Sequence, residues 1–158
     1  MVTCIARDMR IHQLLESIVL LPSLVLLVAN GLPSVWAGEA RSKDAQAILG
    51  KTWEWETTFN PAEEIGAGDP QRYTILLSDG GKLLARFDCN RGGGAYEISD
   101  GKLAFGPLAS TFMACPPDSR ATVFMRDLQR AVSFFVQDGK LYLELPMDSG
   151  TMRFRPAP

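Results

Sequence analysis

Two cysteines and the residues beside them carry the functional groups best suited to chemistry. Cys89 is followed by Asn90, Arg91 and the glycines 92–94, and a second cysteine, Cys115, follows further along the chain. A cysteine thiolate can act as a nucleophile, a redox centre or a metal ligand, and a glycine-rich loop can hold a phosphate group. Each of these activities needs partner groups, so the rest of the sequence decides which of them is available.

The partner groups for most of these activities are missing from the sequence. The single histidine, His12, lies in a segment that we expect to be removed, which excludes Cys-His and Ser-His-Asp mechanisms and histidine-ligated zinc. The cysteines lack CxxC spacing, and residues 95–98 after the glycines have the pattern of a strand, not of a phosphate-binding helix. We therefore expect no catalytic residue, no metal and no cofactor.

Paired carboxylates are the remaining candidates for acid–base chemistry. Glu54 and Glu56 lie on the polar face of an alternating segment, and Glu63 and Glu64 lie in a polar loop. Ordinary solvated charge explains both pairs, so we interpret the chain as non-enzymatic. The chain has a net charge of −2 and no basic tract, so nucleic acid is not an expected partner.

Residues 1–37 have the three parts of a secretory signal peptide. A basic start is followed by the apolar run Leu14 to Ala29 and by small residues that end at Ala37, the expected cleavage site. The alternative is a retained membrane anchor, but the uninterrupted apolar part is much shorter than the roughly 20 residues of a spanning helix. Translation could begin at Met1 or Met9, and Cys4 does not stand where a lipidation cysteine would. We expect a periplasmic or secreted protein with no stable membrane span after cleavage.

Export determines the expected state of the two remaining cysteines. In an oxidising compartment Cys89 and Cys115 should form a disulfide, and a structural bridge is favoured over a redox pair or two buried thiols. Glycines 92–94 would let the chain turn or bulge beside Cys89. Asn90 and Arg91 are then the candidates for contact with a partner, although a plain surface arginine explains Arg91 equally well.

The elements that would position these residues are mainly strands. Residues 52–59 alternate strictly, with Trp53 and Trp55 on one face, and predict a half-buried strand. Both tryptophans are expected in the core, with ligand stacking as the alternative. Residues 60–72 are expected to be a mobile loop. Asp-Gly turns predict hairpins that pair residues 73–77 with 83–88, 95–98 with 102–105, and 134–137 with 140–145.

One helix and a last strand complete the expected fold. Apolar residues recur at helical spacing from Ala121 to Val132, with Arg126, Asp127 and Arg130 on the polar face, and residues 151–155 form a final strand. We predict an α+β fold in which a curled, mainly antiparallel, barrel-like sheet of about eight strands packs against one helix. Residues 38–50 are expected to be a flexible lead and residues 51–156 the folded domain.

The sequence resembles the META domain family, which includes a bacterial heat-shock protein, over residues 47–156. The resemblance lies in Trp53, Cys89-Asn90-Arg91, Gly94-Ala95-Tyr96, Asp100-Gly101-Lys102-Leu103, residues 106–111, Met113-Ala114-Cys115-Pro116 and residues 141–143 with Phe154. Asp88 stands where the family usually has glycine, which questions the local turn. The resemblance implies a small α+β protein of the bacterial envelope, associated with stress and without established catalytic residues.

Two functions remain as expectations. The first is a non-enzymatic, stress-related envelope protein that contacts misfolded or envelope proteins. The second is a periplasmic β module that binds a small ligand or inhibits lysozyme. A deep cavity lined by Trp53 or Trp55 would favour the second function, whereas a filled core with an exposed apolar patch would favour the first.

Overall fold

The computed structural model describes residues 44–158. The predicted signal peptide, residues 1–37, and the first part of the predicted lead lie outside the described residues. Within residues 44–158, no helix has both the length and the apolar character needed to cross a membrane.

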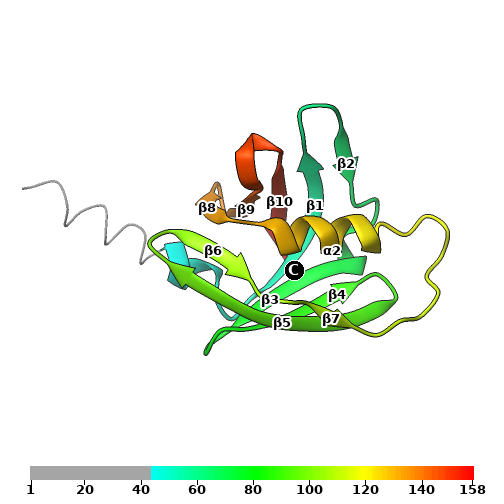
Figure 1. The fold of residues 1–158 in the computed structure, drawn as a ribbon, viewed down its shortest axis with the longest axis horizontal. Coiled ribbons are helices and arrows are strands. Elements are labelled where there is room, and N and C mark those ends of the chain that lie inside the picture. Colours follow the sequence, from blue (N-terminus) through cyan, green and yellow to red (C-terminus); the bar gives the residue numbers. More distant parts are fainter. Residues whose placement is uncertain (1–43) are drawn as a thin grey trace, which may run out of the picture. The chain divides into compact units, whose positions relative to one another are not determined.

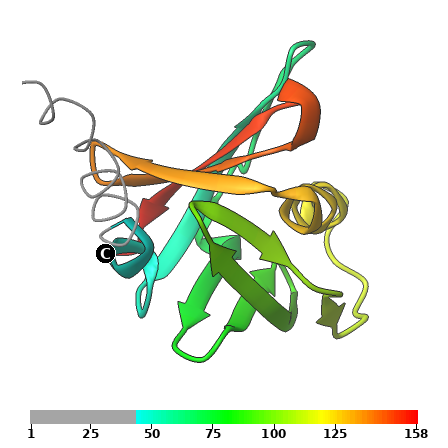
Figure 2. The same ribbon diagram turned by 60° about the vertical axis from the view of Figure 1, so that its left-hand side comes forward.

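The domain consists of an antiparallel, nearly closed, barrel-like sheet and one main helix, as the sequence predicts (Figures 1 and 2). Eight strands follow one another in the order β6-β5-β4-β3-β1-β10-β9-β8, while short strands β2 and β7 pair with β1 and β5. The strands are β1 (Thr52–Phe59), β2 (Glu64–Gly66), β3 (Tyr73–Ser78), β4 (Lys82–Phe87), β5 (Asn90–Ser99), β6 (Lys102–Phe105), β7 (Ala109–Ser110), β8 (Ser133–Gln137), β9 (Lys140–Glu144) and β10 (Thr151–Pro156). The helices are α2 (Ala121–Arg130) and the 3-10 turns η1 (Pro70–Arg72) and η2 (Pro146–Asp148).

The predicted hairpins form where the turn chemistry places them. Strand β3 pairs with β4, β5 with β6, and β8 with β9, each in antiparallel register. The turns Asp100-Gly101 and Asp138-Gly139 have φ values of 51° and 77°, and of 51° and 72°. Two successive residues at positive φ match the twist of the flanking strands, which explains why Asp-Gly is used at both positions.

The core lies between the concave face of the sheet and α2. Trp53 is 2% exposed and Trp55 is 0% exposed, and each indole N–H is satisfied inside the protein, by the Ile48 carbonyl and by the Thr58 hydroxyl. Helix α2 packs Phe124 against Trp55, with ring centroids 5.1 Å apart. Both tryptophans therefore lie in the core, as the sequence predicts, and neither side chain is on the surface.

Two segments are more ordered than expected. Residues 44–48 are helical, Ile48 is completely buried, and Leu49 bridges to Leu77, so the second half of the predicted flexible lead is part of the folded domain. The predicted mobile loop at residues 60–72 contains β2 and η1. Its order has a local cause, because Asn60 Oδ1 accepts hydrogen bonds from the backbone of Ala62 and Glu63.

The triple glycine is a strand, not the predicted turn or bulge. Residues 92–94 lie inside β5, where Gly92 pairs with Ala85 of β4 and with Ser110 of β7. A Cβ atom built on Gly93 would lie 2.0 Å from the Leu83 carbonyl oxygen. The three glycines are therefore required by the close approach of neighbouring backbones, which the local composition alone did not reveal.

One polar residue of the helix is also placed differently from the prediction. Asp127 was expected on the solvated face of α2, but it is 1% exposed. Its Oδ1 atom forms an ion pair with Arg126 at 2.8 Å, and its Oδ2 atom has no protein hydrogen-bond partner among the described residues. The buried carboxylate of Asp127 thereby holds the guanidinium of Arg126, which lies at the surface of α2.

Candidate functional site: an apolar groove beside the disulfide

A groove of about 840 Å³ opens between α2 and the segment from the end of β6 to Cys115. Its volume lies within the range typical of binding sites in proteins. Side chains from both walls and from β6 line it, including Phe105, Phe112, Met113, Met125, Arg126 and Arg130. We call it the helix–loop groove, and Figure 2 shows α2 and the chain that leads to it from β7.

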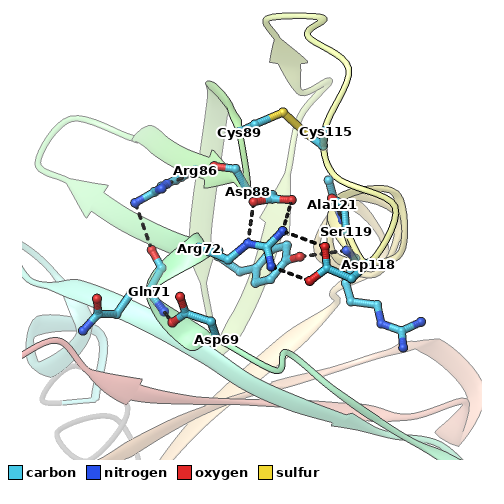
Figure 3. Close-up of polar contacts among 12 residues, drawn as sticks. Asp69, Gln71, Arg72, Arg86, Asp88, Cys89, Cys115, Asp118, Ser119 and Ala121 are labelled. Carbon is cyan, nitrogen blue, oxygen red and sulfur yellow. Dashed lines mark hydrogen bonds and ion pairs between the residues drawn. A yellow bond between two sulfur atoms is a disulfide. The ribbon is translucent and has the colours of Figure 1, made fainter.

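The disulfide fixes one wall of the helix–loop groove. Cys89, directly before β5, and Cys115 form a bridge with an S–S distance of 1.97 Å and a Cα–Cα distance of 5.5 Å. The bond was predicted from the sequence, and it attaches the irregular chain before α2 to the turn between β4 and β5 (Figure 3). The loop therefore has a defined position although it contains little regular structure.

Asn90 holds the same wall through its side-chain amide. Its Oδ1 atom accepts hydrogen bonds from the Thr111 hydroxyl at 2.9 Å and from the Met113 backbone N–H at 2.7 Å. Its Nδ2 atom donates to the Met113 carbonyl at 3.2 Å. The structure thus assigns the carboxamide of Asn90 to internal support of the loop, where the sequence suggested a contact with a partner.

A second cluster, formed by Arg72, Asp88 and Asp118, connects the opposite end of the loop to the sheet (Figure 3). Arg72 donates to both carboxylate oxygens of Asp88 at 2.6 Å and to Asp118 at 2.8 Å. The Asp88 side chain is 6% exposed, whereas that of Asp118 is 70% exposed. Asp88 also has a φ of 62°, the left-handed conformation that suits glycine. Residue 88 therefore has a glycine-like backbone, and its aspartate side chain adds an anchoring carboxylate.

The hydrogen bonds from Arg72 lower the pKa of Asp88 below its ordinary value, and they also lower the pKa of Asp118. A carboxyl group with a depressed pKa in the folded state stabilises the protein above its unfolded-state pKa of about 4. That stabilisation is lost as the pH falls from about 4 through the lower pKa of the folded state.

Replacing Asp88 by asparagine is expected to lower the melting temperature at pH 7 by several degrees. Asparagine tolerates the left-handed backbone, so the change isolates the charged contact with Arg72. The difference from the wild type should shrink as the pH falls from about 4, where Asp88 of the unfolded chain takes up a proton, through the lower pKa of the folded state. Thermal unfolding followed by circular dichroism at pH 7 and pH 3 measures both effects. Asp118→Asn, at an exposed partner of the same arginine, should change little; equal losses in the two variants would contradict this account.

The outer rim of the groove presents apolar side chains to solvent. Phe112 is fully exposed and Met113 is 57% exposed, and the two are adjacent in the loop that Asn90 and the disulfide hold. An aromatic side chain without any packing partner is unusual on a folded domain, and apolar patches of this kind mark interaction surfaces.

The groove has a cationic end. Arg126 and Arg130 of α2 line it, and no aspartate or glutamate is among the residues described around it. Arg130 donates to the hydroxyl of Ser149, a neutral acceptor, at 3.1 Å. The whole chain has a net charge of −2 and Asp127 partly neutralises Arg126, so Arg130 is the main local positive charge next to the apolar wall.

The residues proposed from the sequence are thus separated by the fold. Asn90 and Cys115 line the groove and Cys89 is joined to Cys115 by the disulfide, while Trp53 and Trp55 are in the core. The side chain of Arg91 is exposed, and no hydrogen bond or ion pair to its guanidinium is found within residues 44–158. The sequence analysis missed Phe112, Met113 and the two arginines of α2. The signal that the sequence offered for Phe112 and Met113 is that they form an apolar pair within a segment that has neither strand nor helix periodicity.

The fold and site define a small, disulfide-bonded, barrel-like β domain with one helix. The chain belongs to the META domain family, whose sequence profile matches residues 46–158. No curated protein sequence matches it significantly.

Solved structures share this fold. The NMR structure of a protein from Burkholderia xenovorans is 21% identical with a TM-score of 0.61, and the match covers 87% of this chain and 99% of that one. The crystal structure of a DUF4847-family protein from Bacteroides vulgatus is 13% identical with a TM-score of 0.53, covering 70% and 94% of the two chains. At these identities the likeness concerns the fold alone.

Proposed function

We propose that this META domain protein is a non-enzymatic, exported protein of the cell envelope that supports stress tolerance by binding exposed apolar segments of other envelope proteins. The observation that carries the proposal is the fully exposed Phe112 beside the apolar helix–loop groove. Unfolded and partly folded proteins expose apolar segments that a groove with an aromatic rim can cover.

The burial of the two tryptophans supports this function over a ligand cavity inside the sheet. Trp53 and Trp55 pack in the core and have their indole N–H groups satisfied by the protein itself. The apolar groups available to a partner lie instead on the disulfide-held loop. A filled core with an exposed apolar patch is the arrangement expected of a protein that binds other proteins.

The experiment measures the aggregation of an unfolded client. A urea-unfolded outer-membrane β-barrel protein is diluted into buffer with the exported protein, and light scattering is recorded. We expect the wild type to suppress the scattering. Phe112→Ser should need about tenfold more protein for the same suppression, because an aromatic anchor is a typical binding hot spot.

Met147→Asn is the matched control for this experiment. Met147 is 92% exposed like Phe112, but it lies in η2 and does not line the helix–loop groove. Its φ is 55°, a conformation that asparagine tolerates. Suppression should be unchanged in this variant. Equal suppression by the wild type and Phe112→Ser, or equal loss in both variants, would argue against the groove as the binding site.

Export is tested by the intact mass of the protein after expression in a bacterial host. We expect the mature protein to begin at Gly38, with no free thiol under non-reducing conditions, because cleavage after Ala37 and oxidation of Cys89 and Cys115 accompany export. Osmotic shock should release this species. A membrane-bound product that retains residues 1–37 would instead support an anchor, and two alkylatable cysteines would contradict export to an oxidising compartment.

A further inference from the structure

We propose that the helix–loop groove binds an extended polypeptide segment that pairs with the free edge of β7, places apolar side chains between Phe105 and Met125, and directs an acidic side chain to Arg130. This inference rests on the proposed function and specifies the partner: an apolar segment flanked by acidic residues.

The strand edge is the first argument for an extended polypeptide. Ser110 of β7 lies opposite Gly92 of β5, and the backbone N–H of Thr111 donates to the Arg91 carbonyl at 2.9 Å. Successive N–H groups of a strand point to opposite edges, so the N–H and carbonyl of Ser110 point away from β5. Strand β7 pairs only with β5 among the described strands, and Ser110 itself lines the groove. An incoming strand could therefore add to this edge.

The apolar lining of the two walls is the second argument. Phe105 ends β6, Phe112 and Met113 follow β7, and Met125 faces them from α2. A strand beside β7 would direct alternate side chains towards this apolar surface and the others towards solvent. Main-chain pairing would then supply affinity with little dependence on sequence, while the apolar surface would select the side chains.

Charge complementarity is the third argument. Arg126 is neutralised in part by the buried carboxylate of Asp127, whereas the guanidinium of Arg130 hydrogen-bonds only to the hydroxyl of Ser149 and forms no ion pair among the described residues. A carboxylate of the bound segment would give Arg130 a charged partner and would meet no acidic group in the groove lining. An acidic flank is therefore preferred to a basic one.

Binding of labelled hexapeptides tests these statements. The probe is fluorescein-labelled Glu-Val-Phe-Val-Phe-Glu, with acidic residues at both ends because either strand direction is allowed. Its twin has lysine at both ends, and two further peptides carry N-methyl groups at alternate amides, one for each strand edge. Fluorescence anisotropy with the exported protein gives the dissociation constants.

We expect the acidic peptide to bind about tenfold more tightly than the lysine peptide, as for one charge-assisted hydrogen bond. One of the N-methylated peptides should lose binding because its pairing edge is blocked. Arg130→Gln should still bind the acidic peptide but should no longer prefer it to the lysine peptide. Arg91→Gln changes an exposed arginine outside the groove lining and should keep this preference.

Four results would overturn the inference. Equal binding of the acidic and lysine peptides would exclude the role of Arg130. Unchanged binding of both N-methylated peptides would exclude strand pairing. If the protein binds sodium laurate but none of the peptides, the groove is a site for anionic amphiphiles. If no peptide binds while Phe112→Ser still impairs suppression of client aggregation, the specific inference fails and the proposed function stands.

Discussion

Alanine at Gly93 is expected to destabilise the domain by at least about 3 kcal/mol, and to prevent folding if the native margin is small. The new Cβ atom would lie 2.0 Å from the Leu83 carbonyl oxygen and 3.0 Å from the carbonyl carbon. Both atoms belong to the backbone of the paired strand β4, so no side-chain rotation can relieve the overlap. The pairing of β4 with β5 would have to open locally, and urea denaturation measures the resulting loss of stability.

Gly66→Ala is the matched control. Gly66 is also a strand glycine with an ordinary φ, and a Cβ atom there would have no heavy atom within 4 Å. The substitution should be neutral or slightly stabilising, because alanine restricts the unfolded chain more than glycine does. Similar stability of the Gly93→Ala and Gly66→Ala proteins would show that β4 and β5 do not approach as closely as the structure indicates.

The second large effect is expected from the disulfide. Replacing Cys89 and Cys115 together by alanine removes a bridge with a sequence separation of 26. Loss of a cross-link of this length should lower the free energy of unfolding by roughly 3–4 kcal/mol, mainly because the unfolded chain regains conformational freedom. The urea midpoint should fall accordingly.

Reduction of the wild-type protein is the internal control for the double variant. Dithiothreitol should reproduce most of the loss in the wild type and have no effect on the variant, which has no bridge to reduce. A variant as stable as the oxidised wild type would mean that Asn90 and the Arg72 cluster suffice to hold the loop. The variant should also bind clients more weakly, because Phe112 and Met113 lie on the segment that the disulfide fixes.

The sheet was largely predictable because its signals are local. Strict alternation in residues 52–59 is sufficient to define β1, and the Asp-Gly turns fix three hairpins within one residue of the observed strand ends, except that β5 begins at Asn90, five residues before the predicted start at residue 95. Helix α2 likewise follows from the spacing of Phe124 and Leu128. These patterns depend on neighbours in the sequence and therefore need no knowledge of the tertiary structure.

The features that the sequence did not predict depend on contacts between distant segments. Glycine tolerates turns and close packing equally, so only the positions of β4 and β7 reveal why residues 92–94 are in a strand. Ile48 has no helical or strand pattern around it, and the distant contacts of its segment are those of Leu49 and Gly50 with Leu77 of β3. Asp127 has the composition of a surface residue, and its burial follows from the way α2 lies on the sheet.

The candidate site was predictable in its anchor but not in its surface. The bridge between Cys89 and Cys115 was predicted from the expected export and from the number of cysteines that signal cleavage would leave. The groove requires that the bridge, Asn90 and Arg72 act together to place one irregular loop opposite α2. Those contacts join residues far apart in the sequence, so Phe112 could not be distinguished beforehand from a core phenylalanine.

The burial of Trp53 and Trp55 has a spectroscopic consequence. The only other tryptophan is Trp36, which signal cleavage after Ala37 would remove. The intrinsic fluorescence of the mature protein then comes from two core indoles, which are shielded from water in the folded state and exposed on unfolding. Tryptophan emission would report the folded fraction, while a fluorescein-labelled peptide would report occupancy of the groove. The two signals can be recorded in one sample, which separates variants that unfold from variants that fail to bind.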